Sequence, residues 1–161
     1  ELFCNLVDAD GYYFTHFLQD KAKTAYGGAE LKYGYKDWFD ASLKGTFYSW
    51  KTDNENEELY LMTKPKFELN FYAEAKVFEG LKVYLGYEYV QRKEYVIEEG
   101  NSSRDFGLGN ISNLSVGASY TFLKDLSVFG RVNNLLNKQY YYEYGYPAEK
   151  LNVLAGLSLV F

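Results

Sequence analysis

Hydrophobic and polar residues alternate over long stretches of this chain. The pattern is clearest at 151–161, where every second residue is hydrophobic: Leu151, Val153, Ala155, Leu157, Leu159 and Phe161. A period of two places successive side chains on opposite faces of an extended strand. The pattern therefore predicts a terminal strand with one apolar face, which ends on an aromatic residue.

The same alternation recurs along the rest of the sequence. It predicts strands near 23–36, 39–51, 66–77, 81–89, 114–122 and 126–133. One further strand, less well defined, is expected within 2–7 or 12–18. In the strands from residue 66 onward, one face carries no charged residue. We therefore predict an all-β chain of about eight antiparallel strands, which forms a single region over 1–161.

Alternation alone leaves open which face points outward. In a soluble barrel the apolar face surrounds a small ligand, whereas in a membrane barrel it faces lipid. The connections differ in length: tight turns are expected at 36–37, 79–80 and 124–125, and long connections at about 52–64, 92–110 and 135–149. Short turns at one end and long loops at the other are typical of an up-and-down transmembrane β-barrel.

Aromatic and charged residues support the membrane interpretation. Aromatic residues make up 20% of the chain, and many stand at the predicted strand ends beside the tight turns: Tyr33, Tyr35, Trp38, Phe39, Phe78, Phe122 and Phe161. Such residues form the interfacial girdle of outer-membrane barrels. The opposite face carries charges of both signs, which suit a hydrated lumen: Lys66, Glu68, Glu74, Lys76, Lys82, Glu88 and Arg131.

Composition excludes several functional classes. The 17 basic and 22 acidic residues give a net charge of −5, so the chain has no basic surplus with which to bind nucleic acid. The single Cys4 cannot form an internal disulfide, and the single His16 cannot by itself form a transition-metal cluster. The acidic residues at 53–58 have the irregular spacing of a solvated loop rather than a Ca²⁺ site. We therefore expect no catalytic residues, no metal and no cofactor, and the chain is not expected to be an enzyme.

Residues 134–140 read Asn-Leu-Leu-Asn-Lys-Gln-Tyr, and Gly145-Tyr146-Pro147 and the terminal strand follow. These segments resemble the C-terminal end of TonB-dependent outer-membrane receptors. In that family a penultimate strand runs into an Asn-Leu-(Leu/Phe)-Asn-Lys-x-Tyr segment, an external loop with Tyr-Pro, and the closing strand. The resemblance is closest over 111–161. It implies a protein of the bacterial outer membrane that takes up a scarce nutrient such as a siderophore, corrinoid or glycan.

The end of the chain also resembles the signal that barrel-insertion machinery recognises. Gly156, Leu159 and Phe161 match its Gly, hydrophobic and terminal aromatic positions, whereas Leu154 replaces the polar residue that is usual two positions before the Gly. The resemblance implies two partners, the insertion machinery and outer-membrane lipid.

The length of the chain departs from the family plan. In that family, a barrel of about 22 strands is filled by an N-terminal plug, which engages TonB. Nothing in this sequence resembles the plug, so we expect the C-terminal barrel region of a larger receptor, which contacts TonB only through a plug domain absent here. Unpaired strand edges are costly in lipid, so the isolated chain is expected to close into a small barrel or to pair its edges with another copy.

One cluster of tyrosines is a candidate for contact with a small-molecule nutrient. It comprises Tyr140, Tyr141, Tyr142, Tyr144 and Tyr146, within a predicted external loop. Tyrosine offers a stacking surface and a hydroxyl at small entropic cost, but an outer aromatic girdle is an equally good interpretation.

Two other functions remain as alternatives. One is a free-standing small barrel that acts as an adhesin, anchor or lipid-modifying enzyme, and the other is a soluble ligand-binding barrel.

Overall fold

The computed structural model describes most of the chain. The described residues are 2–7, 14–19, 22–52, 61–93, 96–99, 102–105, 108–123, 126–143 and 146–159. Phe161, Tyr144, the turn at 124–125 and the acidic segment at 53–58 lie outside them. None of the helical residues in these ranges belongs to a segment long and apolar enough to cross a membrane.

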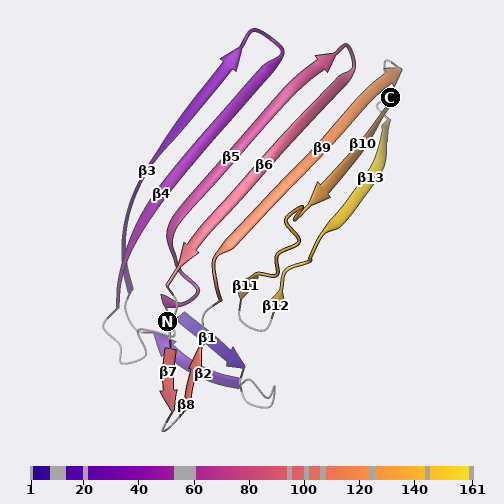
Figure 1. Cartoon of the computed structure of the whole chain (residues 1–161). Helices are drawn as coiled ribbons and strands as arrows, with labels where there is room; N and C mark the ends of the chain where they lie inside the picture. Colours follow the sequence, from indigo (N-terminus) through magenta and orange to yellow (C-terminus); the bar gives the residue numbers. More distant parts are fainter. Residues whose placement is uncertain are drawn as a thin grey trace.

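Seven long strands form one antiparallel sheet (Figure 1). In sheet order they are β3 (Ala22–Tyr35), β4 (Phe39–Thr52), β5 (Pro65–Phe78), β6 (Leu81–Arg92), β9 (Ile111–Leu123), β10 (Leu126–Asn133) and β13 (Asn152–Leu159). Every strand pairs with the next long strand along the chain, which is the up-and-down arrangement predicted from the sequence.

The six remaining strands are short and form separate pairs. These pairs are β1 (Leu2–Val7) with β2 (Phe14–Gln19), β7 (Val96–Glu99) with β8 (Ser102–Asp105), and β11 (Tyr141–Glu143) with β12 (Tyr146–Pro147). Both places considered for the first strand therefore hold a strand, and the two strands pair with each other rather than with the main sheet. The last two pairs lie within connections that were predicted only as long loops.

The register of the sheet brings the apolar positions together on one face. Phe71 lies opposite Leu43 on one side and Tyr87 on the other. Val128 likewise lies between Tyr120 and Leu157. Because side chains alternate along each strand, these pairings extend one apolar surface across all seven strands.

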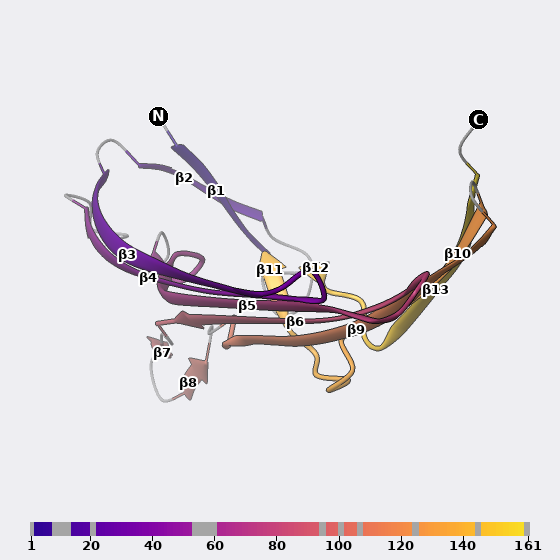
Figure 2. The ribbon, with the colours of Figure 1, turned by 90° about the horizontal axis from the view of Figure 1, so that it is seen from above.

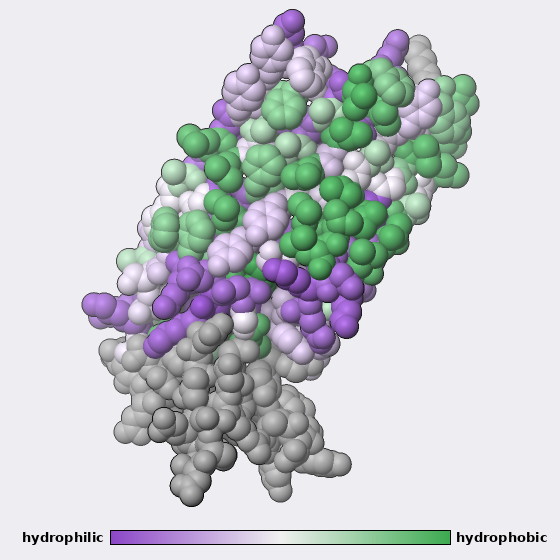
Figure 3. Space-filling model, in the orientation of Figure 1, coloured by the Kyte–Doolittle hydropathy of each residue, from purple (hydrophilic) through white to green (hydrophobic). Residues whose placement is uncertain are grey.

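The apolar surface is the convex one. Figure 2 shows that the sheet is curved like a trough, and Figure 3 shows a broad hydrophobic band on the outer side of that trough. Several large hydrophobic side chains on it are exposed, for example Leu157 with 73% of its surface accessible. A soluble barrel would place these residues inside. The arrangement is instead that of a barrel wall whose outer face meets lipid.

Five of the strands, β3, β4, β5, β6 and β9, have 12 to 14 residues and are long enough to cross a bilayer. β5 has 14 residues, which at about 3.3 Å per residue span about 46 Å. With a tilt of about 45°, such a strand covers about 33 Å along the membrane normal, close to the hydrocarbon thickness of about 30 Å.

The turn from β3 to β4 and the turn from β5 to β6 lie at the upper end of Figure 1, and the short pairs within the long connections, β7–β8 and β11–β12, lie at the lower end. Lys36 and Gly80, one in each of these turns, have φ values of 52° and 85°. Aromatic rings gather beside them, with centroid distances of 5.8 Å for Tyr35 and Trp38 and 6.0 Å for Phe78 and Tyr120. The predicted separation of short and long connections, with aromatic residues at the short-turn end, is present in the structure.

The sheet does not close on itself in the described part of the chain. β3 forms one edge and β13 the other, and Figure 2 shows them far apart at the two ends of the curved sheet. Seven strands in strict antiparallel order place the first and last strands parallel to each other. The expected small closed barrel is therefore not observed, and its antiparallel closure is geometrically impossible with an odd number of strands.

Candidate functional site on the concave face

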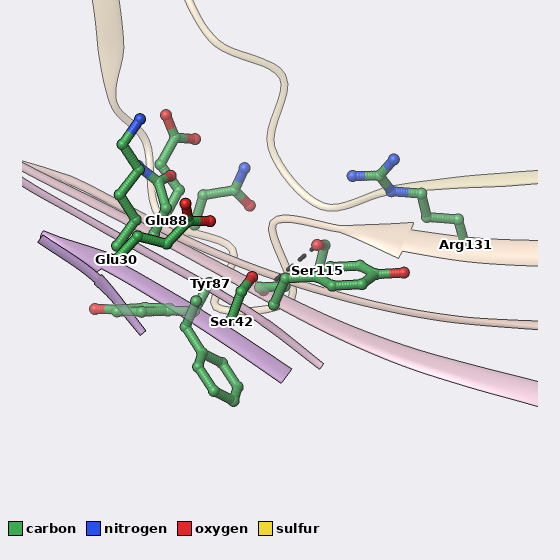
Figure 4. A pocket seen from close by; sticks show the side chains of 12 residues that line it. Glu30, Ser42, Tyr87, Glu88, Ser115 and Arg131 are labelled. Atoms are coloured by element: carbon green, nitrogen blue, oxygen red, sulfur yellow. Dashed lines mark hydrogen bonds between the residues drawn. The ribbon is translucent and has the colours of Figure 1, made fainter. Parts of the chain in front are cut away.

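Polar side chains line the concave face opposite the apolar surface. One row crosses five strands as successive cross-strand neighbours, namely Glu30, Lys44, Asn70, Glu88 and Asn113. With Arg131 and several neighbouring residues they line a hollow of about 310 Å³. Figure 4 shows Glu30, Glu88 and Arg131 on the same side of the sheet. The alternation that makes the outer face apolar thus gives this face its charges and amides.

Some of these charges pair within the wall, and others do not. Lys82 Nζ lies 3.0 Å from Glu74 Oε1, and Tyr72 donates a hydrogen bond to the other oxygen of that carboxylate. Among the described residues, the side chains of Lys44 and Arg131 form neither a hydrogen bond nor an ion pair. The predicted network of charges on this face is therefore only partly formed, and the remaining groups can bind water or a partner in the lumen.

Asn134 organises the loop at the long-connection end of the sheet. It is 1% exposed, and its φ of 49° is a conformation that Asn adopts more readily than most residues. Its Nδ2 donates to the carbonyl oxygens of Lys138 at 2.7 Å and Glu149 at 3.1 Å, and its Oδ1 accepts from the Lys138 amide. The first residue of the Asn-Leu-Leu-Asn motif therefore ties the start of the loop to its end.

Asn137 and Asn113 complete this arrangement. Asn137, with φ 51°, accepts a hydrogen bond from the Leu151 amide just before β13. Asn113 in β9 accepts one from the Asn134 amide at 3.1 Å. The motif thus sets the path of the chain from β10 to β13, which is a structural role.

The candidate tyrosines occupy different environments. Tyr140 is 5% exposed and packs in a small hydrophobic cluster with Val90 and Ile111. Tyr142 stacks edge-on against Tyr140 at 5.5 Å and donates a hydrogen bond to Glu88 Oε2 at 3.2 Å. Tyr146 is 69% exposed.

The Tyr142 side chain therefore contacts the concave wall through Glu88. Tyr141 is held through its backbone, because its carbonyl oxygen accepts a hydrogen bond from Arg92 Nη1. Its hydroxyl accepts another from Gln139 Nε2 at 3.1 Å. Tyr144 lies outside the described residues. Whether any of the five binds a ligand stays a prediction.

Electrostatics keep the Tyr142 hydroxyl neutral. Partial burial, with the Glu88 carboxylate as the next contribution, raises the pKa of Tyr142 far above its ordinary value. Burial also raises the pKa of Tyr140. A neutral Tyr142 hydroxyl can donate a hydrogen bond to the Glu88 carboxylate, so the two residues form a stable contact between the loop and the wall.

Arg92 connects the end of β6 to the tyrosine-rich loop, and the sequence pattern did not single it out. It is 8% exposed at the end of β6, and its Nε has no hydrogen-bond partner among the described atoms. Its backbone amide donates to Asn110 Oδ1 at 2.9 Å. A strand prediction that ended near residue 89 left Arg92 in a loop. Extending the same alternation by three residues would have placed it on the polar face with Glu88.

The structure describes two of the three proposed residues of the assembly signal, Gly156 and Leu159. Gly156 in β13 lies opposite Phe129, whose ring covers it so closely that a Cβ would lie 2.6 Å from the ring carbon Cζ. Leu159 is exposed on the convex face, and Phe161 lies outside the described residues. Recognition by insertion machinery stays a prediction, but the absence of a side chain at Gly156 has a clear steric reason.

The chain has the fold of part of the barrel of a TonB-dependent outer-membrane receptor. The solved structures it matches include the Pseudomonas aeruginosa receptor FpvA bound to a heterologous pyoverdine and iron, with a TM-score of 0.70 and 18% identity. The match covers 94% of this chain and 21% of that one. It confirms the predicted fold.

Two further structures agree. The P. aeruginosa ferripyoverdine receptor bound to ferripyoverdine matches with a TM-score of 0.69 and 17% identity, over 97% of this chain and 23% of that one. The complex of FpvAI with pyocin S2 matches with a TM-score of 0.71 and 18% identity, over 91% and 20%. The chain thus spans about a fifth of these proteins. No family model and no curated protein matches the sequence.

Proposed function

We propose that the chain forms part of the barrel wall and external loops of a TonB-dependent transport receptor in the bacterial outer membrane. The observation that carries this proposal is the continuous division of seven strands into an apolar convex face and a polar concave face. A receptor barrel needs both faces, one toward lipid and one toward a hydrated lumen. The similarity to receptor barrels supports the same function.

The faces and loops have separate partners in this proposal. The convex face contacts outer-membrane lipid, and the concave row from Glu30 to Asn113 borders the lumen. The insertion machinery recognises Gly156, Leu159 and Phe161. TonB acts only through the plug domain of such a receptor.

The cargo in this proposal is a scarce small-molecule nutrient such as a siderophore, corrinoid or glycan. Its contacts include the tyrosine-rich loop 140–146. Within that loop, buried Tyr140 fixes the position and the more exposed Tyr142 and Tyr146 face the nutrient. The hydrogen bond from Tyr142 to Glu88 holds this surface at the rim of the concave wall.

Membrane fractionation tests the proposal. The gene that encodes the chain, with a tag in the loop at 135–149, is expressed in a Gram-negative bacterium, and the outer membrane is separated from soluble protein. We expect the protein in the outer-membrane fraction, with release only by detergent. A Phe161→Ala variant should accumulate less in that fraction, with Leu151→Ala as the control outside the signal. Recovery of a monomeric soluble protein without detergent would contradict the proposal.

A further inference from the structure

An apolar groove crosses the convex face of the sheet. It has a volume of about 530 Å³ and extends from β4 to β10. Its floor consists of Ala75, Val83, Ala118 and Gly130, which are successive cross-strand neighbours. Larger side chains border the floor, among them Phe39, Leu85, Val116 and Val132. A floor of small residues between larger ones leaves an apolar channel on the outer surface.

Lys36 stands in the tight turn before β4, whose first residue Phe39 lines one end of this groove. Lys36 Nζ is 5.4 Å from the centroid of the ring of Tyr35, the residue that pairs with Phe39. The ring of Trp38 lies 5.8 Å from Tyr35 and 5.7 Å from Phe39, and Phe39 lines the groove. The neighbouring rings of Tyr35, Trp38 and Phe39 thus connect the Lys36 ammonium group to the apolar groove. Tyr and Trp at this position mark the level of lipid headgroups.

We propose that this groove binds one anionic phospholipid, with an acyl chain in the groove and the phosphate beside Lys36. The inference rests on the proposed function, because it requires the convex face to lie in a bilayer. The groove lining is apolar, so it accepts hydrocarbon rather than a headgroup. The Lys36 ammonium group, held over the Tyr35 ring, favours lipids whose headgroup keeps a net negative charge.

The two tryptophans of the chain provide a direct assay. Trp38 stands beside the groove, whereas Trp50 lies on the concave side and donates its indole N–H to the Pro65 carbonyl oxygen. A Trp50→Phe background leaves Trp38 as the only emitter. The full chain is refolded into phosphatidylcholine vesicles that contain a small fraction of brominated phosphatidylglycerol or, in parallel, brominated phosphatidylcholine. Bromine quenches tryptophan only at close range.

We expect brominated phosphatidylglycerol to associate with the Trp38 site about fivefold more strongly than brominated phosphatidylcholine, as one lysine near a membrane surface would give. Lys36→Gln should abolish this preference. Gly130→Leu should fill the groove and reduce quenching by both lipids. The matched control is Gly27→Leu on β3, because an added Cβ meets no atom within 4 Å at either glycine. Quenching in this control should stay unchanged.

The outcomes separate the inference from the proposed function. If Trp38 emission stays as in water with either lipid, the convex face does not enter the bilayer and the proposed function fails as well. If Trp38 is in lipid but both lipids quench equally, or Gly130→Leu changes nothing, only the phospholipid site is refuted. A cross-linked dimer that Gly130→Leu abolishes would assign the groove to a second copy and would also overturn the inference.

Discussion

Replacement of Asn134 by Ala should be the most damaging single change at the long-connection end of the sheet. The Asn134 side chain donates to two backbone carbonyl oxygens and accepts from one amide, and it is almost fully buried. Alanine removes all three hydrogen bonds. It also leaves an ordinary side chain at φ 49°, in the left-handed region that Asn tolerates better.

The expected cost follows from these contacts. Leaving a buried polar group without its partner costs about 1–3 kcal/mol. Lys138 and Glu149 are exposed, so water can reach their carbonyl oxygens once the Asn134 side chain is removed. The loss of each of these two hydrogen bonds should therefore cost about 1 kcal/mol, at the lower end of this range. The left-handed backbone adds about 1 kcal/mol for alanine. The free energy of unfolding should therefore fall by about 3 kcal/mol.

Urea titration of the chain folded in lipid vesicles measures this change. Asn134→Gly separates the two causes, because glycine removes the hydrogen bonds but relieves the backbone strain. It should cost about 1 kcal/mol less than Asn134→Ala. The matched control is Asn137→Ala, which has a similar φ but an exposed side chain with one hydrogen bond to an amide. Equal stability of Asn134→Ala and the wild-type chain would refute the structural role of the motif.

Three further predictions concern the faces, the closing strand and the loop. Leu43→Arg, on the convex face, should lower stability in lipid vesicles by about 2–4 kcal/mol, whereas Ser42→Arg on the concave face should cost much less; similar losses would mean that the faces are assigned incorrectly. Gly156→Leu should reduce outer-membrane insertion, measured by fractionation, because the Phe129 ring occupies the space that the side chain needs, and normal insertion would contradict this contact. The raised pKa of Tyr142 stabilises its neutral form, so its contribution is complete below the ordinary tyrosine pKa of about 10 and falls as the pH rises above that value. The difference in urea midpoint between wild type and Tyr142→Phe should therefore be constant from pH 7 to about 9.5 and shrink above pH 10; a difference that grows instead would exclude the neutral hydroxyl as donor.

The strands and their faces were predictable because alternation is a local signal with a global consequence. Once Phe71 and Leu85 are assigned to the apolar face, a slip of one residue in the strand pairing would move the apolar positions of that strand to the opposite face. The observed pairs, such as Phe71 with Leu43, follow that rule. The seven long strands and their two faces could therefore be inferred from the residues alone, whereas the short pairs β7–β8 and β11–β12 could not.

The roles within the loop were not predictable in the same way. Tyr140 and Tyr142 are two positions apart in one tyrosine-rich segment, yet one is buried beside Ile111 and the other reaches Glu88. Their environments depend on where β6 and β9 end, which the local pattern does not specify. The burial of Asn134 likewise depends on Glu149, which is distant in sequence and is brought close by the return of the chain to β13.

The odd number of strands also limits what can complete the barrel. Antiparallel pairing at both edges requires an even total, so the added strands must be odd in number. A second copy in the same membrane orientation would place its β3 beside β13 as a parallel pair, because both strands run in the same direction. Antiparallel pairing of like edges would instead require one copy to be inverted in the membrane. The earlier expectation of pairing with another copy is thus less favourable than pairing with other strands of a receptor. In a Cys4→Ser background, a cysteine at Val153 in β13 and another at Leu31 in β3, both on the convex face, should therefore give no intermolecular disulfide in vesicles, and efficient cross-linking between copies would refute this reasoning.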